Sequence, residues 1–148
     1  MEYTDMAGIA LAVDSTTVVL NGTAILDLVE GDYVVITPAN PATSHVNSIN
    51  GGVNVNERSD RGVHDLTLRV QRFSESDAFM NNLLRQSPPV LVNGSVKESF
   101  SRDGTGGVES WILENGSVTT QPTNTKSSTD GNALQEYVLR FRNASRNL

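Results

Sequence analysis

The feature that most constrains this chain of 148 residues is a set of short turn signals spread along it. Asn-Gly occurs at 21–22, 50–51, 93–94 and 115–116, and Asp-Gly occurs at 103–104 and 130–131. Asn and Asp tolerate a positive φ and Gly adopts it readily, so these dipeptides favour the two-residue turns between antiparallel strands. The chain is therefore predicted to consist mainly of β-hairpins.

The segments beside these turns have the composition and alternation of β-strands. Residues 66–71 place Leu66, Leu68 and Val70 on one face and polar side chains on the other. In residues 137–142, Tyr137, Leu139 and Phe141 share a face in the same way. Further strands are predicted at 17–20, 23–29 and 33–37, and at 90–101 and 111–120, each of which brackets an Asn-Gly turn.

One segment has helical periodicity instead. Residues 74–77 provide a capping serine and early acidic residues, and Pro88 and Pro89 end the segment. Between them, apolar residues recur at helical spacing, at Phe79, Met80, Leu83 and Leu84. We expect a helix of about three turns, with Phe79 and Leu83 buried against the sheet.

These elements predict a mainly β fold of the α+β class. It is an antiparallel β-sandwich or partial barrel with one flanking α-helix and a long extended hairpin loop. The length fits one domain, residues 1–148. The apolar content is modest, at 37%, which suggests thin sheets, long polar loops or burial completed by a partner.

Two stretches have the composition of loops. Residues 38–61 are too long for an idle loop, so they are predicted to be functional or disordered. Their scattered valines and Ile49 indicate a weakly apolar hairpin around Asn50-Gly51. Residues 121–132 contain no large apolar residue and are predicted to form a flexible loop.

The net charge of −6 lies entirely in the first third of the chain. Residues 1–50 contain no Lys or Arg, and their acidic residues are Glu2, Asp5, Asp14, Asp27, Glu30 and Asp32. An acidic segment repels phosphate, which disfavours a nucleic-acid binder that clamps the backbone. A solvated face that keeps the protein soluble is the simpler interpretation.

The residues that most often carry catalysis or bind cofactors are scarce. The chain has no Cys, and its two histidines, His45 and His64, match no metal-ligand spacing. His64-Asp65 lacks a nucleophile elbow, and the glycine-rich residues 104–107 lack the Lys of a phosphate-binding loop. No enzyme activity and no cofactor are expected. No apolar run is long enough for a membrane span and no signal-peptide pattern is present, so folding in a cytoplasm is expected.

The order of these segments resembles bacteriophage tail tube proteins, which are related to the tube subunits of contractile injection systems. The resemblance rests on residues 52–58 (GVNVNER), Arg61-Gly62, residues 65–70 (DLTLRV) and residues 76–84 (SDAFMNNLL). The family's N-terminal Asp-x-Val-x-Gly-like opening is matched only in part, by residues 30–33.

The resemblance implies a structural virion protein whose hexameric rings stack into a tube for DNA passage. It implies contacts with sheath, baseplate and tape-measure proteins, a place in the tail, and synthesis in the host cytoplasm. The loop 38–61 would reach an adjacent ring or subunit. The predicted inter-subunit residues are Arg58, Asp60, Arg61, His64 and Asp65, and an acidic face toward lumen or exterior contains Asp27, Glu30 and Asp32.

Other interpretations stay open. A tail terminator, a baseplate hub piece or a secretion-system tube subunit of the same fold would form single rings that do not elongate. A monomeric β-sandwich that binds a ligand would need an aromatic-lined groove, for which Trp111 is the one indole. A small hydrolase is the least favoured alternative.

Overall fold

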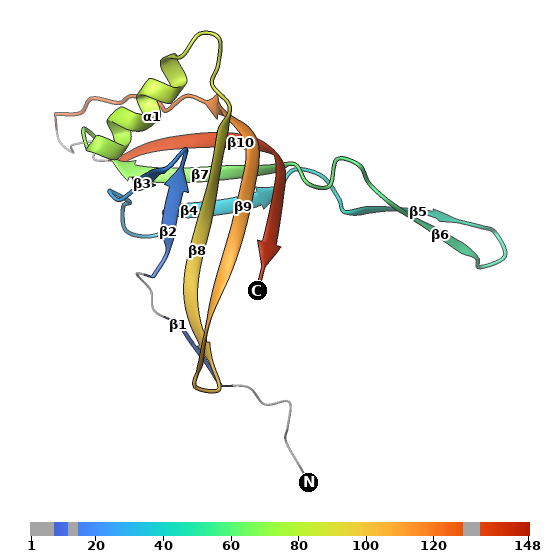
Figure 1. The fold of residues 1–148 in the computed structure, drawn as a ribbon. Helices are drawn as coiled ribbons and strands as arrows, with labels where there is room; N and C mark the ends of the chain where they lie inside the picture. The colour runs from blue at the N-terminus through green and yellow to red at the C-terminus, as the bar shows by residue number, and fades with distance from the viewer. Residues whose placement is uncertain (1–7, 12–14, 129–133) are drawn as a thin grey trace.

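A computed structural model describes residues 8–11, 15–128 and 134–148 (Figure 1). Its main element is an eight-stranded antiparallel sheet, and a separate two-stranded sheet projects from it. The main sheet contains β1 (Ile9–Leu11), β2 (Thr17–Leu20), β3 (Thr23–Ile25), β4 (Val34–Pro38), β7 (His64–Gln71), β8 (Val92–Arg102), β9 (Thr105–Thr120) and β10 (Leu134–Asn147). The smaller sheet contains β5 (Thr43–Asn47) and β6 (Val53–Glu57).

The main sheet has the order β3-β2-β8-β9-β10-β7-β4, and β1 pairs with β8 beyond the end of β2. It bends strongly, so that β4, β7 and the first part of β10 run across the direction of β8 and β9, whereas the last part of β10 follows β9 (Figure 1). The segment after β3 closes the bend, because Val29 N donates to Arg69 O at 3.1 Å and Leu28 bridges Val70. The predicted β-sandwich or partial barrel is confirmed. The strand expected at 23–29 is shorter than predicted, since β3 ends at Ile25.

The concave side of the bent sheet encloses the core. The faces predicted for 66–71 and 137–142 are confirmed, because their apolar side chains are buried. The largest fully buried side chains are Tyr137, Phe141, Leu20, Leu66, Leu68, Met80, Leu113 and Leu139.

The single helix of the described residues, α1 (Glu75–Arg85), packs on this core. Ser74 Oγ accepts a hydrogen bond from Asp77 N at 3.2 Å and caps the helix as predicted. Met80 is the fully buried apolar residue of α1, whereas Phe79 and Leu83 are half-buried at the margin of the core. The predicted helix face is thus correct, but its most buried member is Met80.

Two of the predicted turns are wrong. Asn93-Gly94 and Asn115-Gly116 lie inside β8 and β9, and the turn between these strands is Asp103-Gly104. A Cβ on Gly94 would collide with Val19 O and Leu20, and a Cβ on Gly116 would collide with the Phe141 ring. These glycines therefore permit close packing within the sheet rather than a reversal of the backbone.

The flexible loop predicted at 121–132 is only partly described. Residues 121–128 form no regular secondary structure, and Arg72 Nη2 donates to Asn124 Oδ1 at 3.1 Å. The turn predicted at 130–131 lies outside the described residues.

Candidate assembly surfaces

The β5–β6 hairpin extends away from the rest of the molecule (Figure 1). All residues of its two strands are exposed, and so is the connecting turn. The predicted hairpin around Asn50-Gly51 is confirmed, with Gly51 at φ +87° and Ser48 N donating to Gly52 O at 2.8 Å. A long hairpin without packed neighbours is a surface that a partner can cover.

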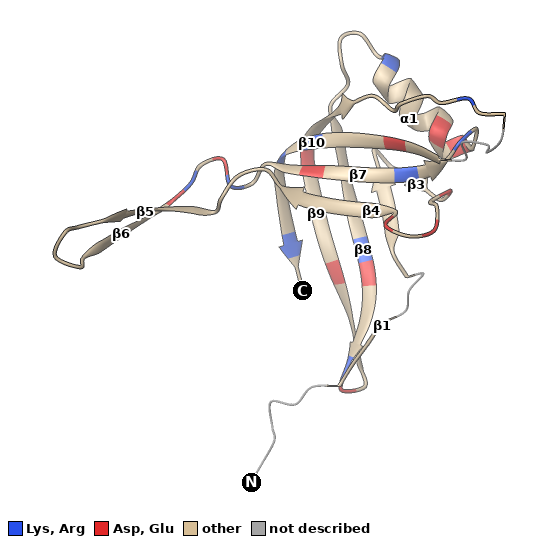
Figure 2. Cartoon of the chain, turned by 180° about the vertical axis from the view of Figure 1, so that it is seen from behind, with Lys and Arg blue, Asp and Glu red and all other residues tan. Residues whose placement is uncertain are grey.

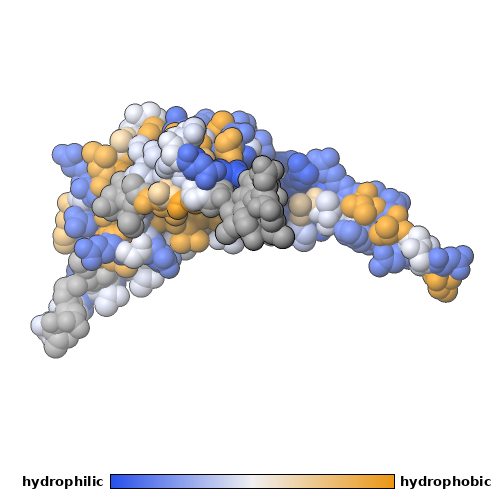
Figure 3. Space-filling view, turned by 90° about the horizontal axis from the view of Figure 1, so that it is seen from below, coloured by the Kyte–Doolittle hydropathy of each residue, from blue (hydrophilic) through white to orange (hydrophobic). Residues whose placement is uncertain are grey.

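The exposed apolar side chains of this arm lie on both of its faces. Directly opposed residues of an antiparallel pair share a face, so Val53 and Val55 lie together with His45, which opposes Val55. Val46 lies on the other face, and Ile49 at the tip is completely exposed. Figure 3 shows apolar surface on one side of the arm and at its tip. From Thr43 to Asn56 the hairpin has no acidic residue and no Lys or Arg.

The predicted charged cluster at the hairpin base forms ion pairs within the same molecule. Arg58 donates two hydrogen bonds of 3.0 Å to Asp60, and these hold the pKa of the Asp60 carboxyl below its ordinary value. Arg61 pairs with Glu57 at 3.4 Å. Because these groups are solvent-exposed, the pairs add little to stability. Their predicted role between subunits stays a prediction.

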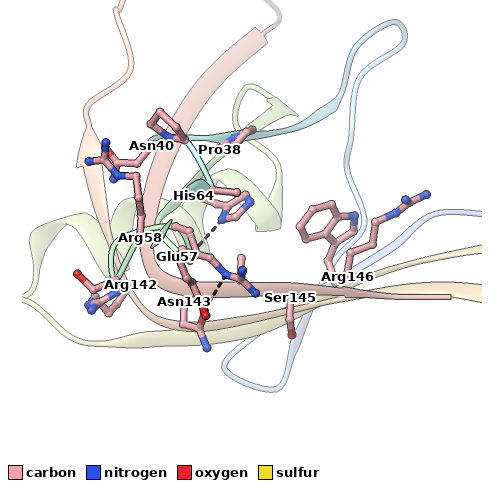
Figure 4. Close-up of a pocket in the computed structure, with 16 residues that line it drawn as sticks. Pro38, Asn40, Glu57, Arg58, His64, Arg142, Asn143, Ser145 and Arg146 are labelled. Atoms are coloured by element: carbon pink, nitrogen blue, oxygen red, sulfur yellow. Dashed lines mark hydrogen bonds and ion pairs between the residues drawn. The ribbon is translucent and has the colours of Figure 1, made fainter. Parts of the chain in front are cut away.

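Beside this cluster lies an open pocket of ≈ 840 Å³, the hairpin-base pocket (Figure 4). Its walls include the half-buried rings of His64 and Trp111, whose centroids are 5.6 Å apart. His64 Nδ1 lies 2.9 Å from Gly62 O. In the described ranges no three His, Cys, Asp or Glu residues gather into a potential metal site. Trp111, the single indole of the sequence, lines this pocket.

The outer face of the sheet, opposite the core, is rich in Ser and Asn. Val96, Leu113 and Ala144 face the core, so strand alternation directs their neighbours outward. The outward side chains of β8, β9 and β10 include Ser95, Lys97, Ser99, Ser101, Val108, Ser110, Ile112, Glu114, Asn143, Ser145 and Asn147.

The charged side chains that strand alternation directs to this outer face are balanced in sign (Figure 2). Asp65 accepts two hydrogen bonds from Arg140, at 2.8 and 3.0 Å, which lower the pKa of Asp65. Arg69 pairs with Glu136 at 2.9 Å. Lys97 and Glu114 add one charge of each sign. Asp65, predicted as an interface residue, thus belongs to a paired row on the sheet. Arg142 of β10 lines the hairpin-base pocket.

The predicted acidic residues lie between β3 and β4, at the opposite end of β7 from the hairpin. Asp27 Oδ2 accepts a long hydrogen bond of 3.4 Å from Ser76 N, in the first turn of α1. Its negative charge there is favourable to the helix dipole. Glu30 and Asp32 are exposed, and Asp32 contributes its backbone oxygen to Arg69 Nη1 at 2.7 Å. Asp27 thus also has a structural role.

One apolar surface was missed by sequence reasoning. The core face of β8 and β9 continues beyond the enclosed core, where Leu11, Phe100 and Leu148 line an open groove of ≈ 470 Å³. Arg146 and Glu109 also line the groove, and Arg146 Nε donates a hydrogen bond of 2.7 Å to Glu109 Oε2. Val96 and Phe100 share a face of the strand predicted at 90–101, but that strand alone does not show that Leu11 and Leu148 lie beside it.

α1 is the one helix in the described ranges, and it is too short and too polar to span a membrane. No protein-family model matches the sequence, and no curated protein matches it.

Several solved structures have a similar fold, and three of them are components of contractile injection particles. A chain of the PVC extracellular contractile injection system, from the sheath–tube complex in the extended state, has a TM-score of 0.62 at 16% identity, covering 93% of this chain and 91% of that chain. The tube-terminating cap of the anti-feeding prophage gives 0.61 at 18% identity, with coverage of 93% and 91%. The PVC sheath/tube terminator gives 0.60 at 15% identity, with coverage of 94% and 97%. At these identities the likeness establishes a shared fold over nearly the whole chain, the fold that the sequence resemblance predicted.

Proposed function

We propose that this protein is a structural subunit of the tail tube of a phage-like particle. The observation that carries the proposal is the match of fold over 93% of the chain to a component of a sheath–tube complex. The exposed β5–β6 arm supports it, because an isolated protein gains nothing from such a surface.

In this proposal six copies close into a ring through a head-to-tail contact, and the rings stack around a channel. The β5–β6 hairpin reaches a neighbouring copy, and Arg58, Asp60, Arg61 and His64 lie at its base, where that contact begins. Sheath, baseplate and tape-measure proteins are the other partners. The assembled protein resides in the tail, after synthesis in the host cytoplasm, and DNA passes through without specific binding.

The outer face of β8, β9 and β10 is the part of the sheet best suited to line the channel. Its short Ser and Asn side chains give a smooth surface, and its balanced charges attract a passing polymer of neither sign. This assignment leaves Asp27, Glu30 and Asp32 outside the channel wall, in the segment between β3 and β4.

Electron microscopy of the concentrated protein, with light scattering of the same sample, tests the proposal. We expect hollow tubes or stacked rings of constant diameter, with or without seeds from disrupted tails. A strict monomer in the presence of such seeds would contradict the proposal.

The channel wall has its own test, because the sequence has no Cys and single thiols can be placed freely. In Ser99→Cys tubes, a bulky gold-linked maleimide should fail to label the thiol, whereas the monomer should be labelled fully. Asn82→Cys on the exposed side of α1 is the control that should react in both states. Labelling of Ser99→Cys along the outside of intact tubes would exclude the wall assignment.

A tube-terminating role is the second candidate, favoured by the nearly equal TM-scores of the cap and terminator structures. A terminator would form closed single rings that do not elongate. The same micrographs separate the two roles, because only a tube subunit produces stacks of variable length.

A further inference from the structure

Four Asn-Gly dipeptides occur in this protein, and their structural surroundings differ strongly. We propose that Asn50 is a site of spontaneous deamidation and that the folded structure protects Asn21, Asn93 and Asn115. The proposal concerns a chemical modification of the hairpin tip and does not depend on assembly.

The reaction needs only the dipeptide and water. The backbone nitrogen of the glycine loses its proton and bonds to Cγ of the asparagine. The bond between Cγ and the amide nitrogen Nδ2 breaks, the amide group leaves as ammonia, and a five-membered succinimide ring remains. Water then opens the ring at either carbonyl, giving Asp or its isomer isoaspartate. Glycine favours this attack because it has no Cβ to obstruct the approach.

Three of the dipeptides are held by a ladder of hydrogen bonds across β2, β8 and β9. Asn93 N donates to Asn21 Oδ1 at 2.9 Å, and Asn21 Nδ2 donates to Leu91 O at 3.4 Å. Asn115 N donates to Asn93 Oδ1 at 2.9 Å. The amide groups of the Asn21 and Asn93 side chains are thereby fixed in position, and attack on either requires this ladder to open first.

The glycine partners of two of these residues are also held by packing. Gly94 is half-buried against Val19 and Leu20, and Gly116 is buried against the Phe141 ring. Their nitrogens lie within strands that are paired on both sides. For Asn115, whose amide group forms no hydrogen bond within the described ranges, this burial of Gly116 provides the protection.

Asn50 has none of these restraints. Asn50 and Gly51 are both exposed, and a Cβ on Gly51 would meet nothing within 4 Å. Among the described residues no group hydrogen-bonds the Asn50 side chain, and Gly51 N donates only within its own turn, to Ser48 O at 3.2 Å. Among the described elements, β5 and β6 have extensive contacts only with each other, so the hairpin tip can change conformation without opening the core.

Deamidation places a carboxylate beside Ile49, at the end of an arm that otherwise carries no acidic residue from Thr43 to Asn56. Where the arm contacts a second copy, a consequence that rests on the proposed function, this charge must be desolvated. Subunits that remain unassembled for long would therefore lose competence to join a tube.

Peptide mapping by mass spectrometry tests the chemical step on the full-length protein. Samples are aged in mildly alkaline buffer, and the mass gained when NH2 is replaced by OH is followed at each asparagine. Cleavage after glutamate is needed, because the first arginine is Arg58 and trypsin leaves Asn21 and Asn50 in one peptide. The control is the same protein aged in concentrated urea.

In the folded protein we expect Asn50 to deamidate at least tenfold faster than the other three. In urea all four should react at similar rates, because each asparagine is followed by glycine and none is held by folded structure. Native rates at Asn21, Asn93 or Asn115 that equal the rate at Asn50 would overturn the proposal, and so would an Asn50 that reacts in urea but not in the folded state.

The consequence for assembly is tested separately with Asn50→Asp. We expect this variant to remain folded and to form tubes more slowly than the unchanged protein. Asn82→Asp, with the same charge on α1, should assemble normally. If the unchanged protein forms no tubes, the proposed function fails while the mapping result stands. If Asn50→Asp assembles at the normal rate, the modification has no role in assembly.

Discussion

The carboxylate of Asp77 connects α1 to β10 and to the segment between β7 and α1. Its Oδ1 accepts a hydrogen bond of 2.6 Å from the Tyr137 hydroxyl on β10, and its Oδ2 accepts one of 2.9 Å from Phe73 N. Burial of the Tyr137 hydroxyl, strengthened by this carboxylate, raises the pKa of Tyr137. The start of α1 is thereby fixed to the sheet by a bond to a charged group, one of the stronger kinds.

Tyr137→Phe should lower the free energy of unfolding by about 1–3 kcal/mol at neutral pH, because Asp77 loses a buried donor. The wild-type protein should lose additional stability as the pH rises above about 10, where the unfolded tyrosine ionises but the folded one does not. Tyr137→Phe lacks this alkaline loss. Urea unfolding of both proteins at several pH values measures the effect, and parallel pH profiles would contradict it.

Gly116→Ala should destabilise the protein by about 1–3 kcal/mol, because the added methyl group meets the Phe141 ring. Gly106 offers a matched control in the same strand, since a Cβ there meets nothing within 4 Å. Gly106→Ala should change the free energy of unfolding by less than about 0.5 kcal/mol. Equal effects of the two substitutions, measured by thermal unfolding, would show that the ring moves aside.

At the scale of elements, the packing of α1 on the core depends mainly on Met80, which the sequence did not single out over Phe79 and Leu83. Met80→Ala should lower the free energy of unfolding by about 2–5 kcal/mol, because it leaves a cavity in the core. Leu83→Ala should cost less, since Leu83 is half-buried. The exposed Asn82→Ala serves as the control within the same helix. A larger effect at Leu83 than at Met80 in urea unfolding would mean that the helix is rotated.

The elements could be predicted where local chemistry alone decides them. The cap at Ser74, the prolines after α1 and the alternation in β7 act over a few residues, and each prediction from them is confirmed. The prediction failed at Asn93-Gly94 and Asn115-Gly116, whose backbones are set by Leu20 and Phe141 from distant strands. A dipeptide cannot show whether its glycine permits a turn or a close contact.

For the assembly surfaces, too, the sequence predicts features that depend on local composition but not those that depend on distant strands. The hairpin at 38–61 was predicted from its length and valines, which are local properties. The groove at Leu11, Phe100 and Leu148 combines two strands and the residue after β10, which lie far apart in sequence, so no single segment revealed it. The pairing of Asp65 with Arg140 likewise follows from strand register, which composition does not determine.

For the whole molecule, the hairpin should be dispensable for folding but needed for assembly. Arg58 N donates to Ala42 O at 3.0 Å, so a short Gly linker can replace residues 43–57 without moving the base. We expect this deletion to melt as cooperatively as the full-length protein, by calorimetry, and to form no stacked rings. Loss of the cooperative transition would show that the arm belongs to the fold.

A charge reversal at Arg61 tests the hairpin base separately. Arg61→Glu should leave the melting temperature almost unchanged, because the ion pair with Glu57 is exposed. It should weaken tube assembly if the base meets a second copy, as the proposed function requires. Light scattering during assembly measures the effect, and normal growth of tubes would remove Arg61 from the contact.

The order of strands in the main sheet also determines how the protein must fold. β2 finds its partner in β8, more than seventy residues later, and β4 and β7 join on either side of the projecting hairpin. Closing such long loops costs entropy before any strand pairing compensates for it, so proteins of this topology fold in milliseconds to seconds rather than microseconds. During that interval β2 and β3 have no sheet to join, and their edges are open to other nascent polypeptides. If the protein is made in many copies, as the proposed function requires, a chaperone would have to keep these edges apart until β8 emerges.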